Sequence, residues 1–158
     1  MGSGKTSVGK YLAKKTGYDF KDTDEMIEEK QKCSVQSIFA SNGEKYFRKL
    51  ETETIENLNG KLNHTILSTG GGLPITEGNG ALLRQLGQVI FLRAEKATIK
   101  NRLAGDKSRP LLAGDDQEDK MEALLKFRTP IYETVANIII HTDQKSLNEI
   151  AQEIIDKL

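Results

Sequence analysis

The stretch that decides the fold stands at the start of the chain and reads Gly2-Ser3-Gly4-Lys5-Thr6, with a helical pattern directly after it. Its glycines let backbone N–H groups turn inward around a phosphate, in conformations that other residues resist. The N-terminus of the following helix adds a favourable dipole. The lysine can reach the β- and γ-phosphates of a nucleotide, and the threonine hydroxyl can ligate Mg²⁺. The stretch therefore predicts a nucleotide phosphate site.

The motif is incomplete at its beginning. Its full form is G-x-x-x-x-G-K-[ST], and the first glycine would fall two positions before Met1. The strand that normally precedes such a loop is missing as well. We therefore expect the natural protein to begin upstream of Met1, with roughly ten more residues that supply this strand. The alternative is that residues 2–6 are only a flexible glycine-rich leader.

Length, charge and cysteine content restrict the class of protein. The 158 residues fit one compact domain. Basic and acidic side chains number 23 each, which argues against a nucleic-acid partner, because such proteins carry a positive surplus. The single cysteine, Cys33, suits a reducing cytoplasm. The longest apolar run has four residues, 89–92, too short to span a membrane. We expect a cytoplasmic protein, and a monomer.

Short β-leaning segments alternate with helical patterns along the chain. The segments are Tyr18–Lys21, Thr65–Thr69, Gln88–Leu92 and Asn137–Thr142. This alternation predicts an α/β fold with crossover connections. Residues 35–58 have the pattern of a pair of helices inserted between the first two segments. Residues 104–119 combine glycines, a proline and five acidic residues, which predicts a mobile surface segment.

Two carboxylates follow the first visible strand, in Asp22-Thr23-Asp24. Ligands of parallel sheets bind at the ends of the strands. There, one carboxylate could hold a metal-bound water and the other could accept a hydrogen bond from a substrate hydroxyl. Asp22 with Glu25 three residues later also fits a helix cap. Both interpretations can hold together.

Three consecutive glycines, Gly70, Gly71 and Gly72, follow the next strand. A sharp turn needs only one or two glycines, so three indicate a place where a ligand approaches the main chain closely. A simple turn is the alternative.

Three arginines could bind anionic groups. Arg48 has Glu51 one helical turn later, which could be only a surface ion pair. Arg109 stands in the segment 104–119, and an arginine on a closing loop can neutralise charge on a transferred phosphoryl group. Arg128 shortly precedes Pro130, which should kink its helix or begin a new one with Thr129 as the cap.

Together these residues resemble the shikimate kinase family, small P-loop kinases of the nucleoside-monophosphate-kinase structural class. The resemblance covers the whole chain. It rests on residues 2–6, 22–24, Ile38-Phe39 with Gly43-Glu44, Phe47-Arg48, 70–72, Arg109-Pro110-Leu111-Leu112 and 128–132. It implies a three-layer α/β fold with a parallel sheet in the order 2-3-1-4-5, of which this chain lacks the first strand. It also implies one domain over residues 1–158, with a substrate-binding helical insertion at about 33–60 and a lid at about 104–119.

The resemblance further implies an activity and a site. The activity is phosphorylation of the 3-hydroxyl of shikimate by ATP, with Mg²⁺, in aromatic amino-acid biosynthesis. Catalytic residues would be Lys5, Asp24 and Arg109. ATP would be bound by Gly2, Ser3, Gly4, Lys5, Thr6, Ser7, Arg102, Arg109 and Lys145. Shikimate would be bound by Asp24, Arg48, Gly70, Gly71, Gly72 and Arg128, with Glu51 in support. The metal would be held by Thr6 and, through water, by Asp22.

Two other functions stay open at this point. A related kinase for gluconate or a nucleoside monophosphate would share the phosphate loop, and a panel of acceptors would distinguish it. A nucleotide-binding module without activity is the other, because the motif is incomplete. It would bind ATP without acceptor-dependent release of ADP.

Overall fold

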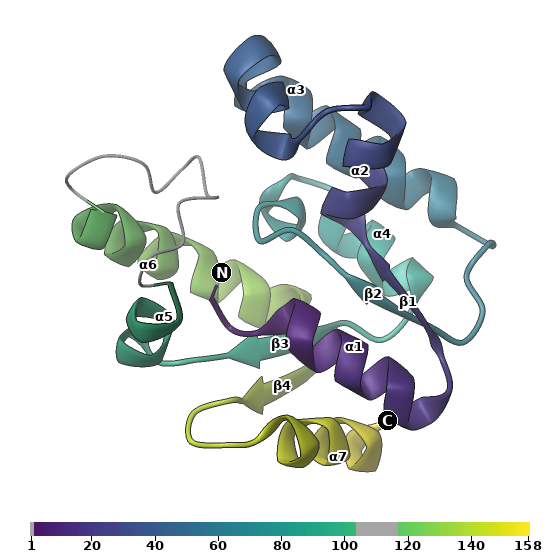
Figure 1. Ribbon diagram of the computed structural model, residues 1–158, viewed down its shortest axis with the longest axis vertical. Helices are drawn as coiled ribbons and strands as arrows, with labels where there is room; N and C mark the ends of the chain where they lie inside the picture. The colour runs from purple at the N-terminus through teal and green to yellow at the C-terminus, as the bar shows by residue number, and fades with distance from the viewer. Residues whose placement is uncertain (1, 104–116) are drawn as a thin grey trace.

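The computed structural model describes residues 2–103 and 117–158, apart from the side chains of residues 102, 103, 117 and 118. Helices and strands alternate in it, as expected (Figure 1). Their order is α1 (Lys5–Thr16), β1 (Asp19–Asp22), α2 (Thr23–Gln31), α3 (Val35–Leu58), β2 (Thr65–Ser68), the 3-10 helix η1 (Leu73–Ile75), α4 (Asn79–Leu86), β3 (Ile90–Arg93), α5 (Lys96–Leu103), α6 (Gln117–Val135), β4 (Ile138–His141) and α7 (Leu147–Lys157). The four expected strands are confirmed, with ends shifted by one or two residues.

The strands form two parallel pairs. β1 pairs with β2, with Asp19 opposite Thr65, and β3 pairs with β4, with Ile90 opposite Ile138. Within the described part of the chain, no hydrogen-bonded pairing joins β2 to β3. The two pairs are those of the expected order 2-3-1-4-5 with its central strand left out. The expected α/β fold with parallel strands is confirmed.

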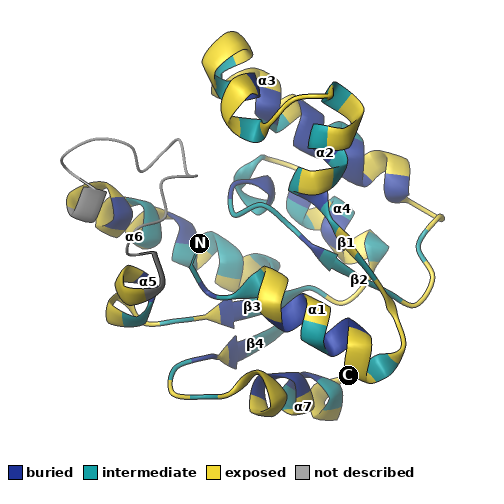
Figure 2. Ribbon diagram, viewed as in Figure 1, coloured by how far each residue is buried: buried dark blue, intermediate teal, exposed yellow. Residues whose placement is uncertain are grey.

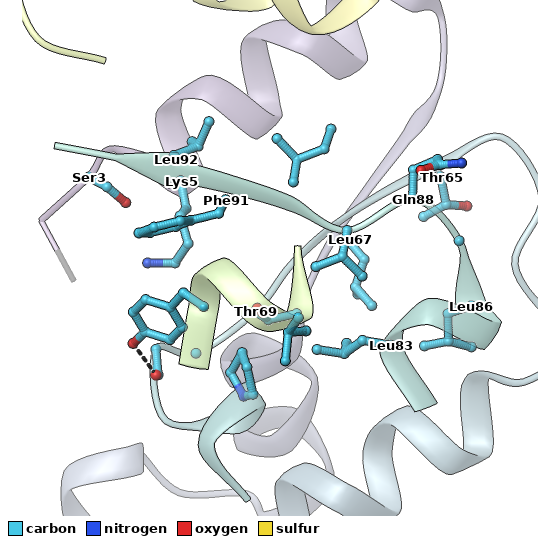
Figure 3. A pocket seen from close by; sticks show the side chains of 18 of the residues that line it. Ser3, Lys5, Thr65, Leu67, Thr69, Leu83, Leu86, Gln88, Phe91 and Leu92 are labelled. Atoms are coloured by element: carbon cyan, nitrogen blue, oxygen red, sulfur yellow. Dashed lines mark hydrogen bonds between the residues drawn. The ribbon is translucent and has the colours of Figure 1, made fainter. Parts of the chain in front are cut away.

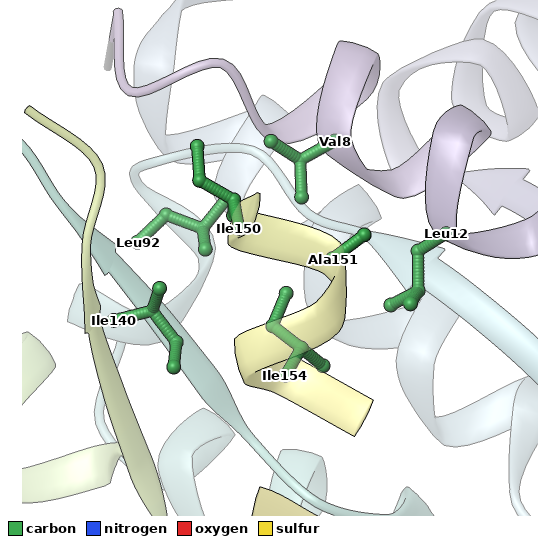
Figure 4. Close-up of a cluster of buried hydrophobic side chains, with 7 residues drawn as sticks. All are labelled: Val8, Leu12, Leu92, Ile140, Ile150, Ala151 and Ile154. Atoms are coloured by element: carbon green, nitrogen blue, oxygen red, sulfur yellow. The ribbon is translucent and has the colours of Figure 1, made fainter. Parts of the chain in front are cut away.

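Helices cover both faces of the strands, and burial is concentrated between the layers (Figures 1 and 2). On one face, apolar residues of α1 and α7 pack on β3 and β4 (Figure 4). On the other face lie α4 and α6, where Leu83 packs with Ile55 of α3 and Leu73 of η1. The first cluster consists of Val8, Leu12, Leu92, Ile140, Ile150, Ala151 and Ile154.

Two cavities lie between β2 and β3. One cavity of about 210 Å³ lies on the α4 and α6 side and is lined by Leu83, Leu86 and Val135 (Figure 3). A second, of about 270 Å³, lies on the α1 and α7 side. Both are bordered by Leu67 of β2 and Ile90 of β3. The facing edges of β2 and β3 therefore border partly open space between two layers of helices, and the side chains of Leu67 and Ile90 are only half-buried.

The helices differ in two places from a regular pattern. Gly43, with φ of 79° and ψ of 173°, breaks α3 into two helical parts, which confirms the expected pair of helices. Pro130 lies inside α6, which continues to Val135, so the expectation of a new helix capped by Thr129 is wrong. Contacts beyond the proline hold the helix, because Arg84 donates hydrogen bonds to the carbonyls of Thr134 and Val135. Tertiary packing here outweighs local preference.

Two further expectations concern the predicted lid and the absence of a membrane-spanning helix. Most of the predicted lid, residues 104–116, lies outside the described residues, and residues 117–119 belong to α6. In the described ranges, no helix has both the length and the apolar character needed to cross a membrane.

The cavities lead to a prediction about two isoleucines on neighbouring strands. Ile140 is fully buried, so Ile140→Ala should lower the free energy of unfolding by about 2–5 kcal/mol. Ile90→Ala should cost less than half as much, because Ile90 already borders open space. Urea denaturation of both variants measures the difference. Equal losses would show that packed atoms surround Ile90 on all sides and would contradict the cavities.

Candidate active site

The phosphate loop has the backbone conformation that its glycines permit. Gly2 and Gly4 have φ of 63° and 86°, in the left-handed region that favours glycine. α1 begins at Lys5, and no side chain caps it at Gly4. The N–H groups of its first turn therefore point at the space before the helix, as an anion site requires. Ser3, within this loop, is buried.

Thr6 and Asp22 bring the loop to the end of β1. The Thr6 hydroxyl donates to Asp22 Oδ2 at 3.5 Å, a long hydrogen bond. Asp22 Oδ1 caps α2 by accepting from the Asp24 N–H at 3.0 Å, which confirms the expected cap, while its role toward a metal stays a prediction. A hydroxyl and a carboxylate fit Mg²⁺, which prefers oxygen ligands and keeps several waters. Among the described residues, no group of three or more His, Cys, Asp or Glu forms a metal site, so phosphates and water would complete the coordination.

Gly70 and Gly72 have a packing role in addition to their conformational freedom. A Cβ atom on Gly70 would lie 2.7 Å from Glu51 Oε1 and 2.8 Å from Asp24 Oδ1. A Cβ atom on Gly72 would lie 2.0 Å from Arg48 Nη1. Three charged side chains therefore pack directly against the main chain of this turn, where no larger residue fits.

Arg48 is held in one place by charge and by aromatic rings. Its Nη1 donates to Glu51 Oε2 at 2.6 Å, and its Nη2 donates to Glu44 Oε1 at 2.9 Å. The guanidinium lies 5.9 Å from the centre of the Phe39 ring and 5.6 Å from that of Phe47, distances at which a cation is attracted to a ring face. Glu51 is fully buried, so the alternative of a surface ion pair is wrong.

Electrostatics make Glu51 an unusual carboxyl group. Burial raises its pKa to about 7, and Asp24 acts in the same direction, while Arg48 and Arg128 oppose the rise. Burial on its own would lower the pKa of Arg48, but Glu51 and Glu44 outweigh it and the net pKa is raised. Glu51 Oε1 is buried and makes no hydrogen bond to any described residue. This oxygen can accept a hydrogen bond from a ligand hydroxyl.

Helix α6 closes the site on the opposite side from α3. Arg128 is only 8% exposed. Burial raises the pKa of both Glu51 and Tyr132, and the charge of Arg128 opposes both rises, so Arg128 lies beside both side chains. The Tyr132 hydroxyl donates a hydrogen bond to the Gly71 carbonyl, drawn as the dashed line in Figure 3. Lys5 borders the same cavity as Gly70, Gly71 and Tyr132. The phosphate loop and the turn at residues 70–72 therefore border the same cavity.

The structure gathers most of the predicted residues that it describes, but not Lys145. Lys145 forms an ion pair with Glu153 of α7 at 2.6 Å, and its role toward ATP stays a prediction. Arg109 and the side chain of Arg102 lie outside the described part of the chain.

Two contributors were not singled out from the sequence. Thr23 accepts a hydrogen bond from the Gly70 N–H at 3.2 Å, and Tyr132 holds Gly71. The signals that could have found them are the position of Thr23 between two aspartates and that of Tyr132 one helical turn after Arg128.

A glycine loop before a helix, carboxylates at the ends of parallel strands and helices on both faces define a P-loop kinase. A family model described as "Shikimate kinase" matches residues 1–158. The shikimate kinase of Dictyoglomus turgidum is 40% identical over 161 aligned residues, which cover 100% of this chain and 92% of that protein. The shikimate kinase of Geobacter sulfurreducens is 41% identical over 98% of this chain and 84% of its own length. The chain belongs to the shikimate kinase family.

Solved structures agree with this assignment. The shikimate kinase of Acinetobacter baumannii in complex with shikimate superposes with a TM-score of 0.94 at 38% identity, over 99% of this chain and 87% of that one. The shikimate kinase of Aquifex aeolicus gives a TM-score of 0.81 at 30% identity, over 99% of this chain and 90% of that one.

The raised pKa of Glu51 predicts a pH dependence of stability. Its carboxyl group has a pKa of about 7 in the folded protein against 4.5 for the unperturbed group, so the folded state holds its proton more tightly. This contribution to stability is complete below pH 4.5 and is lost as the pH rises through 7. The loss should reach at most about 3 kcal/mol, and Glu51→Gln should abolish it.

Urea denaturation of wild-type protein and Glu51→Gln at pH 4.5, 6 and 7.5 measures this dependence. Glu51→Gln also removes the ion pair with Arg48, so the comparison is between slopes with pH and not between absolute stabilities. Parallel curves for the two proteins would contradict the prediction.

Proposed function

We propose that the protein transfers the γ-phosphoryl group of ATP to the 3-hydroxyl of shikimate, giving shikimate 3-phosphate and ADP, in aromatic amino-acid biosynthesis. Membership of the shikimate kinase family supports this activity. The observation that supports it most directly is the convergence of Arg48, Arg128 and Asp24 on the turn at residues 70–72, next to Lys5.

The acceptor side matches the chemistry of a polyol that bears a carboxylate. Arg48 and Arg128 supply two planar cations for the carboxylate, a task that suits the fork of arginine. Asp24 orients the 3-hydroxyl and accepts its proton as the phosphoryl group arrives. Gly70 already donates its N–H to Thr23, so the main-chain donors left for the acceptor are those of Gly71 and Gly72. These three glycines nevertheless form one substrate-binding turn.

The nucleotide side consists of the loop 2–7, in which Lys5 and the first amides of α1 hold the phosphates. Thr6 and, through water, Asp22 would hold Mg²⁺, which would supply positive charge to the phosphates of ATP. Arg102, Arg109 and Lys145 would complete the ATP site, and an arginine on a closing loop would neutralise charge on the transferred group. Transfer between bound partners requires positioning and charge neutralisation more than covalent chemistry.

We further propose that the enzyme acts in the cytoplasm as a monomer. The single cysteine, Cys33, is free and exposed, a state that a reducing compartment preserves.

Replacing Asp24 tests its role. Asp24→Asn keeps the shape of the side chain but removes its charge, so kcat should fall by about 100-fold or more. The KM for ATP should stay within about twofold, because Asp24 serves the acceptor. A coupled assay of ADP release with MgATP and shikimate measures both values. Asp19→Asn, at the exposed start of β1, is the control and should keep full activity. Near-wild-type turnover of Asp24→Asn would show that the proposed role is wrong.

The same assay separates the other functions. Gluconate and nucleoside monophosphates in place of shikimate should give no ADP release above background. Binding of ATP without release of ADP under any acceptor would instead indicate an inactive nucleotide-binding module.

A further inference from the structure

The three glycines belong to a single four-residue turn. The Gly70 carbonyl accepts a hydrogen bond from the Leu73 N–H at 3.2 Å, so residues 70–73 form a β-turn whose central peptide joins Gly71 to Gly72. Gly72 has φ of −88° and ψ of −21°, close to the third position of a type I turn.

A turn of this sequence has two accessible forms. Types I and II differ mainly in the direction of the central peptide, and type II requires the positive φ that glycine supplies at the third position. With glycine at both central positions, steric repulsion selects neither form. Some other interaction must therefore determine which way the Gly71–Gly72 peptide faces.

Tyr132 makes that interaction. Its hydroxyl donates to the carbonyl of Gly71, which is the carbonyl of the central peptide. A trans peptide is planar, with its carbonyl and its N–H on opposite sides, so holding the Gly71 carbonyl toward Tyr132 directs the Gly72 N–H away from it. Rotation of this peptide would leave the partly buried Tyr132 hydroxyl without this acceptor, which is unfavourable.

The tyrosine is itself well fixed. Its ring packs on Phe91 of β3, with ring centroids 5.2 Å apart at an angle of 53°. It lies on α6 one helical turn after Arg128, and the turn that it holds packs against the guanidinium of Arg48 at Gly72. One hydroxyl thus connects the elements that carry the two arginines.

We propose that Tyr132 is a positioning residue that keeps the Gly71–Gly72 peptide in the single orientation that binds the acceptor. The inference rests on the proposed function, because it concerns the same acceptor site. Without the hydroxyl, the turn populates both orientations and the acceptor binds only one of them. The apparent affinity for the acceptor then falls by the fraction of competent molecules, while the chemistry in the bound complex is unchanged.

Tyr132→Phe tests this inference, because it removes the hydroxyl and keeps the ring on Phe91. The KM for shikimate should rise about tenfold, while kcat and the KM for ATP stay within about twofold. Tyr11→Phe is the matched control, since it removes a hydroxyl that bonds Asn148 at 3.2 Å away from the site, and it should change none of these values.

Two kinetic outcomes would overturn the inference. One is a wild-type KM for shikimate in Tyr132→Phe, and the other is a parallel loss in kcat and in both KM values, which indicates general damage to the fold. Failure of the proposed function is a different result, because the wild-type protein itself would then release no ADP with shikimate.

A second measurement tests the inference even if shikimate is not the acceptor. In the wild-type protein, ¹⁵N relaxation dispersion at the Gly72 amide should be flat, because its peptide has one orientation. In folded Tyr132→Phe, exchange on the microsecond-to-millisecond timescale should appear there. Dispersion at Gly72 in the wild-type protein would overturn the inference.

Discussion

The buried ion pair between Arg48 and Glu51 is the interaction on which the rest of the acceptor site depends. Glu51 has no exposed surface, and a buried carboxylate is tolerated only with a partner of opposite charge close by. The 2.6 Å contact with Arg48 supplies that partner. It also fixes the guanidinium against the main chain at Gly72. Once these two side chains are placed, there is room for nothing larger than glycine beside them.

This constraint links elements that are distant along the chain. The turn after β2 must approach α3 closely enough for Gly70 to touch both Glu51 and Asp24. Helix α6 reaches the same turn through Tyr132. The acceptor site is therefore built between layers, and the pKa of Glu51 is set by its burial together with the charges of Arg48, Asp24 and Arg128. The phosphate loop, in contrast, is a local structure made by consecutive residues at the start of one helix.

Much of this arrangement follows from short-range patterns in the sequence. Apolar runs bounded by polar residues or glycine predicted the last three of the four strands, because burial between helical layers demands such runs. The glycines of the phosphate loop predicted left-handed backbone at Gly4, because other residues rarely adopt it. Long-range contacts were less accessible. The continuation of α6 through Pro130 depends on Arg84, 46 to 51 residues away, and the pairing of Lys145 with Glu153 competes with its predicted role toward ATP.

The sequence by itself determined the class of fold, the phosphate loop, and the types of residue that would bind the carboxylate and the hydroxyl of an acceptor. These features depend on spacing and on intrinsic side-chain chemistry. The tertiary structure alone decided that Glu51 is buried with a pKa of about 7, and that the triple-glycine turn packs against charged side chains. It alone decided that Tyr132 sets the direction of the central peptide of that turn. These properties arise from contacts across 20 to 60 residues of chain, and no local pattern specifies which groups exclude water from one another.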